Sequence, residues 1–293
     1  MCMNEPIPPQ AWPLFDRYVH GDLSRRGFLE QAATFAGGPA GAVALLAALS
    51  PNFAAAQQVK PDDARLATRR HTFPSPDGNG QVQGYMVKPF NATGKLPAVL
   101  VVHENRGLNP HIEDITRRVA LAGYVAYAPD ALTPLGGYPG NEDDARASFA
   151  KLDVAKARAD IVASARGLLT LADANGKLGV VGFCWGGQLS SHVATQVPEL
   201  AVAVPFYGGA PALDDVPRIK ARLQLHYAAN DERVNASWPA YEAALKAAGV
   251  RYEQFTYPGT QHGFHNDTTP RYDAAAAQLA WERTLAAFKA ALS

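Results

Sequence analysis

Residues 177–187 read KLGVVGFCWGG, and this stretch is the clearest indication of the fold. A short apolar run ends at Gly182, Cys184 follows two residues later, and a helix-like segment starts from Gln188. A nucleophile flanked by glycines two residues away on either side is the pattern of a nucleophile elbow, a sharp strand-to-helix turn. Bulky neighbours would clash in the strained backbone of such a turn, which explains the glycines. The stretch predicts that Cys184 is a nucleophile; the alternative is a buried, unreactive cysteine in an ordinary turn.

Asp231 and His262, which come later in the chain, complete a candidate triad with Cys184. In α/β-hydrolases the nucleophile is followed first by the acid and then by the histidine. Asp231 comes just after the apolar segment 223–227, and His262 follows the segment 252–257. Active sites form at the carboxyl ends of strands in open α/β sheets, so these side chains are expected to meet there. Taken singly, Asp231 could cap a helix and His262 could be an exposed loop histidine, but together with Cys184 they indicate a Cys-His-Asp triad.

The chain resembles the dienelactone hydrolases (carboxymethylenebutenolidases) over roughly residues 65–290. The matching segments are 182–187, Asp231, QHGF at 261–264 and VVHENRGL at 101–108. The resemblance implies hydrolysis of a lactone or ester, and it implies that Glu104 deprotonates the cysteine. Without the elbow, Glu104 would be interpreted as an exposed loop carboxylate.

The resemblance also implies two arginines that bind a substrate carboxylate, and both are missing here. Pro134 and Asn266 stand in their places. Arg106 and Arg233 lie near the corresponding loops and are candidates to bind substrate, with a solvated surface charge as the alternative for each. The fold and the nucleophile are therefore expected to carry over, but the dienelactone substrate is not.

The predicted chemistry is acyl transfer through a thioester. Cys184 would attack an ester carbonyl, and the backbone N–H groups of Trp185 and Asn105 would stabilise the oxyanion. His262, oriented by Asp231, would activate the thiol and then a water molecule. The nearest alternative is a general periplasmic carboxylesterase. A non-catalytic binding protein would not need the triad, and a thiol redox protein would need an external resolving thiol.

The N-terminal region is predicted to direct export. Residues 24–30 (SRRGFLE) resemble a twin-arginine motif, and the weakly apolar stretch 32–49 is too broken by glycine and proline for a membrane span. Three alanines at 54–56 offer a cleavage site. We expect a signal peptide at 1–56, one α/β-hydrolase domain at 57–293, and a periplasmic or secreted enzyme that meets the export machinery transiently. The alternative for the N-terminus is an amphipathic helix.

Composition narrows the classes of partner. The chain has 27 basic and 27 acidic residues without basic runs, which argues against binding to nucleic acid or an anionic membrane surface. Its cysteines are Cys2, inside the predicted leader, and Cys184, so no internal disulfide is expected after processing. Zinc-type spacing, a P-loop and a dinucleotide-binding motif are absent from the sequence, so neither a metal nor a cofactor is expected. The expected partner is a small lactone or ester, with no stable membrane insertion.

The expected fold is a single-domain α/β structure, a mostly parallel, doubly wound sheet with helices on both faces. Two antiparallel edge strands are expected at 68–73 and 81–87, at the start of the domain. Further strands are expected at 97–103, 124–127, 200–206, 223–227 and 252–256. Helices are expected at 112–121, at 143–171 with a break near Asp153, at 238–248 and at 273–291.

Overall fold

The computed structural model describes residues 7–55 and 57–293 of the chain. Cys2 and Ala56, and with them part of the predicted leader and cleavage site, lie outside the described residues. The chain divides into two compact units. The small one runs up to Asn52 and includes Thr268–Pro270, and the large one consists of Phe53–Asp267 and Arg271–Ser293.

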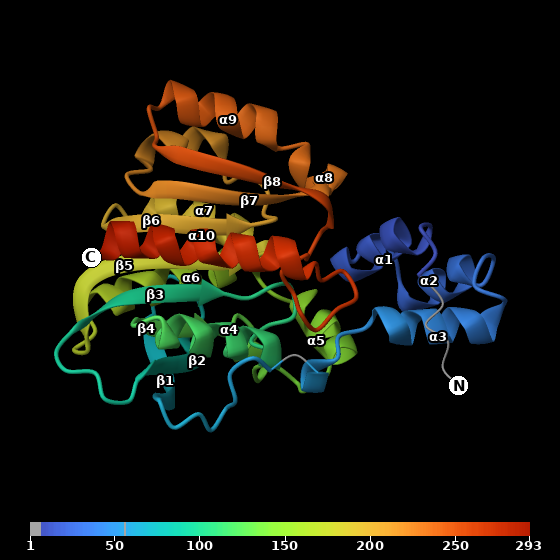
Figure 1. Cartoon of the computed structure of the whole chain (residues 1–293), viewed down its shortest axis with the longest axis horizontal. Helices are drawn as coiled ribbons and strands as arrows, with labels where there is room; N and C mark the ends of the chain where they lie inside the picture. The colour runs from blue at the N-terminus through green and yellow to red at the C-terminus, as the bar shows by residue number, and fades with distance from the viewer. Residues whose placement is uncertain (1–6, 56) are drawn as a thin grey trace. The chain divides into compact units, whose positions relative to one another are not determined.

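The large unit is built on one eight-stranded sheet with the order β1-β2-β4-β3-β5-β6-β7-β8 (Figure 1). β1 and β2 pair antiparallel, as do β2 and β4, and every other pair is parallel. This topology confirms the predicted mostly parallel sheet with an antiparallel edge pair. The strands are β1 (Leu66–Ser75), β2 (Gly80–Pro89), β3 (Leu96–Val102), β4 (Val125–Pro129), β5 (Ala174–Phe183), β6 (Leu200–Phe206), β7 (Arg222–Asn230) and β8 (Tyr252–Gln261).

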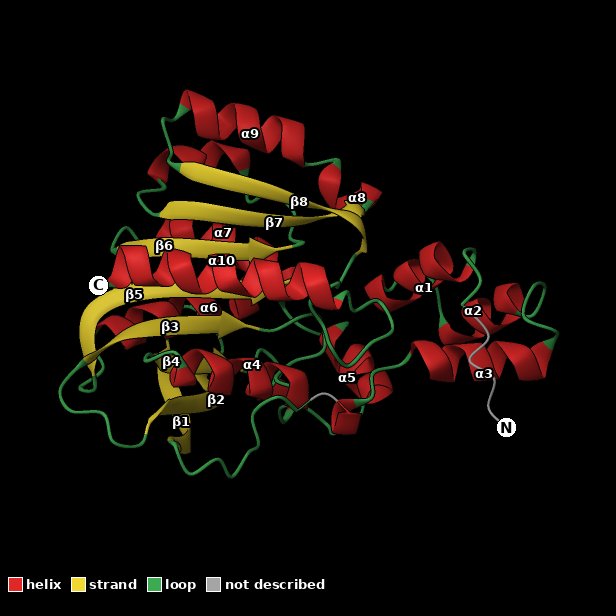
Figure 2. Cartoon of the chain, viewed as in Figure 1, coloured by secondary structure: helices red, strands yellow, loops and turns green. Residues whose placement is uncertain are grey.

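Helices cover both faces of this sheet (Figure 2). Side chains of α4 and α10 pack on one face, and side chains of α6, α7 and α9 pack on the other. The helices are α4 (Pro110–Leu121), α5 (Glu142–Phe149), α6 (Val154–Leu169), α7 (Trp185–Gln196), α8 (Glu232–Asn235), α9 (Trp238–Ala247) and α10 (Ala274–Leu292). Short 3₁₀ turns are η1 (Phe53–Ala55), η2 (Thr133–Leu135) and η3 (Leu213–Arg218).

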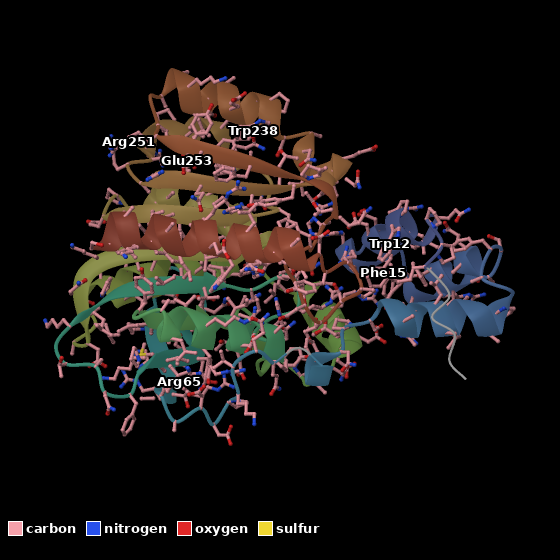
Figure 3. The ribbon with its side chains drawn as sticks, viewed as in Figure 1. Trp12, Phe15, Arg65, Trp238, Arg251 and Glu253 are labelled. Carbon is pink, nitrogen blue, oxygen red and sulfur yellow. The ribbon has the colours of Figure 1, made fainter. Side chains whose placement is uncertain are left out.

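Strand β3 shows why the sequence folds into three layers. Its alternate residues point to opposite faces, so Leu100 and Val102 pack with α6 and α7 while Val99 and Val101 pack with α4 and α10. All four are fully buried, as expected for an apolar run that is covered on both sides. At the β8 edge of the sheet, Trp238 of α9, which is labelled in Figure 3, packs against Tyr227 of β7 and Tyr252 of β8.

Two local details bear on the predictions. The helical break near Asp153 is confirmed, because this residue caps α6 by accepting bonds from the N–H groups of Ala155 and Lys156. β8 is longer than expected, since it continues through Pro258 and Gly259 up to Gln261. A proline is tolerated there because β8 is an edge strand.

The small unit contains three helices with their own apolar core. They are α1 (Ala11–His20), α2 (Arg25–Ala32) and α3 (Pro39–Leu49). Phe28, in the middle of the twin-arginine-like motif, is fully buried among the rings of Phe15 and Tyr18. Ser24 caps α2 by accepting a bond from Gly27 N–H. Among the described residues, no helix combines the length and apolar character that crossing a membrane requires.

Candidate active site

Cys184 lies in the tight turn between the end of β5 and the start of α7. Its φ of 55° and ψ of −112° fall in a region that L-residues rarely adopt. Among the described non-glycine residues, only Tyr207 shares a positive φ. The Cys184 N–H donates to Phe206 O at 3.0 Å, which ties the turn to the neighbouring strand. This geometry is that of a nucleophile elbow.

The glycines of the elbow are required by close backbone packing. A Cβ atom on Gly182 would lie 2.1 Å from Gly186 O, and one on Gly186 would lie 2.2 Å from Val102 O. A Cβ atom on Gly187 would lie 2.3 Å from Phe206 O. These neighbours are backbone atoms and cannot move aside as a side chain could. The helix and the flanking strands therefore approach closely only because glycine occupies all three positions.

Asp231 and His262 meet at the carboxyl ends of β7 and β8. His262 Nδ1 lies 2.6 Å from Asp231 Oδ2, and both side chains are buried. The other carboxylate oxygen, Oδ1, accepts from Val234 N–H at 3.3 Å, so Asp231 also caps α8. The two interpretations of Asp231 are thus compatible, whereas an exposed loop histidine at 262 is excluded by its burial.

The charge on His262 is set by its neighbours. Burial alone would lower its pKa, but the Cys184 sulfur and the Asp231 carboxylate outweigh burial and raise it to about 10. Part of this effect is a hydrogen bond between His262 and Cys184. His262 therefore has a raised pKa and lies next to the sulfur, and a neighbouring imidazolium favours the thiolate form of a cysteine.

Glu104 follows β3 and is held by a residue from the loop after β8. Asn266 Nδ2 donates to Glu104 Oε2 at 2.9 Å, and Asn266 is buried. Burial, then the charges of Glu104 and Cys184, raise the pKa of Tyr207 well above its ordinary value. Tyr207, which is fully buried, therefore lies near both Glu104 and Cys184, which are partly buried. Sequence analysis missed Tyr207, although it follows the apolar segment 200–206 much as Asp231 follows its own strand.

The two candidate arginines have different surroundings. Arg106 is buried; it donates to Asn105 O at 2.8 Å and forms an ion pair with Glu142 of α5 at 3.5 Å. The alternative of a solvated surface charge is therefore wrong for Arg106. Arg233 is exposed on α8, in line with that alternative. Pro134, in place of one expected arginine, lies in the turn η2.

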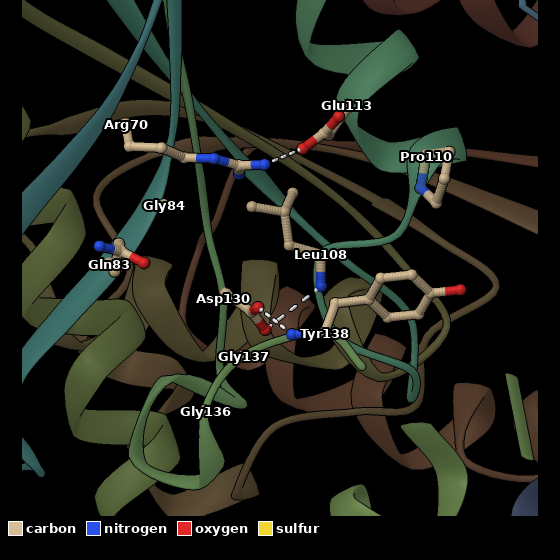
Figure 4. Close-up of a pocket in the computed structure, with 10 residues that line it drawn as sticks. All are labelled: Arg70, Gln83, Gly84, Leu108, Pro110, Glu113, Asp130, Gly136, Gly137 and Tyr138. Carbon is tan, nitrogen blue, oxygen red and sulfur yellow. Dashed lines mark hydrogen bonds and ion pairs between the residues drawn. The ribbon is translucent and has the colours of Figure 1, made fainter. Parts of the chain in front are cut away.

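Asp130 organises the two loops beside the candidate active site. Its carboxylate accepts from the backbone N–H groups of Leu108, Leu132 and Tyr138 at 3.3, 3.0 and 2.8 Å. Two of these bonds are visible in Figure 4, at the floor of a polar pocket of about 250 Å³. The bonds tie the loop after β3, which carries Glu104, to the loop after β4.

The two predicted oxyanion-hole residues follow the neighbouring strands β3 and β5. Trp185 is the first residue of α7, where a backbone N–H has no acceptor within its own helix. Asn105 lies in the loop directly after β3. Among the described residues of the large unit, no three His, Cys, Asp or Glu side chains are close enough together to hold a metal ion.

The sheet order, the crossing helices and the elbow at Cys184 define an α/β-hydrolase. Residues 82–292 match the model of the Dienelactone hydrolase family, so the chain belongs to this family of hydrolases. A second family model, YqhI-like, matches residues 3–37.

Individual relatives agree with this assignment. An Escherichia coli K12 protein named "Putative carboxymethylenebutenolidase" is 33% identical over 244 residues, which cover 78% of this chain and 89% of that protein. The E. coli K12 "Putative hydrolase fragment YghX" is 58% identical over 105 residues, 36% of this chain and 90% of the fragment. The crystal structure of a "Putative Dienelactone Hydrolase" from Klebsiella pneumoniae superposes with a TM-score of 0.66 at 28% identity, covering 76% of this chain and 99% of that one.

Proposed function

We propose that the protein hydrolyses a lactone or carboxylic ester through an acyl-enzyme on Cys184. The observation that carries this proposal is the short contact between His262 Nδ1 and Asp231 Oδ2, beside a cysteine in a strained elbow. The raised pKa of His262 supports a resting pair of imidazolium and thiolate. The family assignment supports the reaction class.

The proposed reaction has two halves. The Cys184 thiolate attacks the carbonyl carbon, and the N–H groups of Trp185 and Asn105 stabilise the oxyanion. The C–O bond then breaks, and His262 gives its proton to the leaving alkoxide, which leaves a thioester. In the second half, neutral His262 takes a proton from water, and the resulting hydroxide attacks the thioester carbonyl. The C–S bond then breaks, which releases the acid and restores the Cys184 thiolate beside protonated His262. In the fraction of molecules in which Cys184 is protonated, Glu104 is proposed to take the thiol proton and so to form the same thiolate.

The test is a panel of lactones, thioesters and p-nitrophenyl esters assayed with the full-length protein. Turnover of at least one lactone or ester is expected, with the acyl group found on Cys184 when the reaction is quenched early. Absence of turnover across the panel, together with absence of a covalent adduct, contradicts the proposal. A general carboxylesterase is the second candidate, and it is favoured by the lack of an arginine at Pro134 and Asn266.

Neutral substrates are expected to be preferred over substrates with a free carboxylate. Asn266, in place of an expected arginine, is engaged by Glu104, and Arg106 is paired with Glu142. A lost charge-assisted bond is worth about 1.5–3 kcal/mol, or about ten- to a hundredfold in affinity. We therefore expect kcat/KM for a dienelactone methyl ester to exceed that for the free acid by about tenfold, measured in competition.

The opposite preference would show that another cation binds the carboxylate. Arg233→Ala distinguishes the cases, because this side chain is exposed and its loss does not disturb the core. A preference for the free acid that disappears in Arg233→Ala would identify Arg233 as the anion-binding residue and overturn the expectation.

We also propose that the protein is exported by the twin-arginine route and processed near Gln57. The motif at 24–30 supports this proposal. So does the attachment of the chain just beyond the expected cleavage site, where Val59 N–H donates to Asp114 Oδ1 at 2.8 Å and Val59 O accepts from Arg117 Nε at 2.8 Å. A chain that starts near residue 57 therefore keeps the backbone contacts that fasten it to α4.

Replacing both arginines of the motif with lysine is expected to leave unprocessed protein in the cytoplasm. The measurement is cell fractionation with N-terminal sequencing, and the wild-type periplasmic protein should begin near Gln57. Arg17→Lys, a similar change outside the motif, is the control and should be exported normally. Wild-type protein that keeps its three N-terminal helices in every fraction contradicts the proposal.

A further inference from the structure

His103 is a buried side chain between the two loops that Asp130 also links. It is fully buried, and no role was assigned to it from the sequence. Its Nε2 accepts from Ala131 N–H at 3.0 Å, and its Nδ1 lies 2.5 Å from Glu104 O. A backbone N–H can only donate, so Nε2 carries no proton, and the proton of the neutral ring is on Nδ1. His103 therefore donates from Nδ1 to the Glu104 carbonyl.

Burial keeps this ring neutral. It lowers the pKa of His103, while the nearby Asp130 carboxylate opposes the shift. A neutral ring with one donor and one acceptor suits its two backbone partners, because both Glu104 O and Ala131 N–H would otherwise be left without this bond inside the protein.

The bond to Glu104 O also determines where the next N–H points. Glu104 C=O and Asn105 N–H belong to one planar trans peptide, so they point in opposite directions. When His103 holds the carbonyl on one side, the Asn105 N–H is directed to the other side. That N–H is one of the two proposed oxyanion donors.

The ring of His103 contacts the residue that supplies the other donor. It stacks on Trp185 with the centroids 5.3 Å apart and an interplanar angle of 19°. Phe149 of α5 packs edge-on against Trp185 at 5.0 Å and completes an aromatic group of three rings. The same side chain thus contacts both halves of the predicted oxyanion hole.

We propose that His103 is a positioning residue for the oxyanion hole. Its side chain holds the Glu104–Asn105 peptide and the Trp185 ring in fixed positions relative to each other. This inference rests on the proposed acyl-transfer function. Substitution of His103 is expected to affect the transition state, because the ring contacts the two residues that carry or adjoin the oxyanion donors and does not itself donate to the substrate. Removing one oxyanion donor outright costs about 10²- to 10³-fold in kcat, and misdirecting one is expected to cost less.

Two substitutions separate the polar function of the ring from its packing. His103→Phe keeps an aromatic ring against Trp185 but can neither donate nor accept. His103→Asn places an amide N–H close to the position of Nδ1 and can still bind Glu104 O. We expect His103→Phe to lower kcat by about 10- to 100-fold with KM within about twofold, and His103→Asn to recover most of that loss.

A second measurement distinguishes the oxyanion hole from the nucleophile. Alkylation of Cys184 by iodoacetamide displaces iodide without forming an oxyanion, so its rate, followed by peptide mapping, should be similar in wild type and His103→Phe. The affinity for a trifluoromethyl ketone, which forms an oxyanion on the enzyme, should fall in parallel with kcat/KM. The control is His71→Phe on β1, a histidine that packs against Phe73 and is not bonded to either catalytic loop.

The outcomes are separable. Equal losses of alkylation and hydrolysis in His103→Phe, or unchanged ketone affinity, overturn the positioning role. If His103→Phe does not fold, a failure of His103→Asn to retain ketone affinity overturns it as well. If wild-type protein is alkylated at Cys184 but neither turns over esters nor binds the ketone, the proposed function fails first.

Discussion

Cys184→Ala is expected to lower kcat by about 10⁴-fold or more, because no other side chain at the elbow can form the acyl-enzyme. The Cys184 side chain makes no capping hydrogen bond at the start of α7, so the variant is expected to keep the backbone turn without the sulfur. The measurement is turnover of the best substrate of the panel, with thermal unfolding as the check on folding. One equivalent of a thiol alkylator should abolish the activity of the mature enzyme, which lacks Cys2 once the predicted leader is removed, and should modify Cys184 in a peptide map.

Cys184→Ser is the matched comparison. It keeps an oxygen nucleophile in the elbow, but a serine hydroxyl is far less ionised than a thiol beside the same imidazolium, so most of the activity should be lost. Turnover in Cys184→Ala above a small residual rate would mean that Cys184 is not the nucleophile. Another side chain would then have to act as the nucleophile.

Asp231→Asn is expected to lower kcat/KM by up to about 10⁴-fold. The carboxylate accepts from His262 Nδ1 at 2.6 Å, and it is one of the two groups that raise the pKa of His262 to about 10. An asparagine offers no charge and can present an N–H to Nδ1, which favours the wrong tautomer. The pKa of His262 is therefore expected to fall in the variant, and the alkaline limb of the kcat/KM profile should move to lower pH.

The raised pKa of His262 also makes the free energy of unfolding depend on pH in a definite direction. The folded-state pKa of His262 is raised above its ordinary value of 6.5, so its stabilising contribution is fully present below pH 6.5 and is lost as the pH rises through about 10. The wild-type advantage over Asp231→Asn in free energy of unfolding should therefore shrink over that range. Denaturant unfolding at several pH values measures it. An unchanged alkaline limb and a pH-independent difference in stability would show that Asp231 does not act on His262.

Much of the fold could be predicted because its causes are local. Gly182 and Gly186 on either side of Cys184 predict the elbow, since only glycine tolerates the backbone contacts at those two positions. The apolar run of β3 predicts a strand covered on both faces, and Asp153 marks a helix start through its own side chain. The position of Asp231 and His262 after apolar segments also follows from the sequence, because strand ends in a parallel sheet share one edge.

The N-terminal region shows the limit of composition. Its paired arginines and alanine-rich stretch predict a signal, and no fold was expected for it. The structure nevertheless contains a three-helix unit in which Phe28 is buried. Burial of one face by three short helices depends on how they pack together, and the amphipathic pattern of any single helix does not reveal it.

The amino-acid sequence was enough to predict the sheet, the elbow and the location of Cys184, Asp231 and His262 at strand ends, whereas their surroundings depend on how the strands and helices pack. Three strands, β5, β6 and β7, lie between β3 and β8 in the sheet, so no ladder bond links their loops, and side chains must do so. Asn266 reaches Glu104 across that gap, and Asp267, next to it, accepts from His111 at 3.0 Å. These contacts join residues more than a hundred positions apart, and the strand order that brings them together is the outcome of packing and cannot be seen in any local stretch of chain.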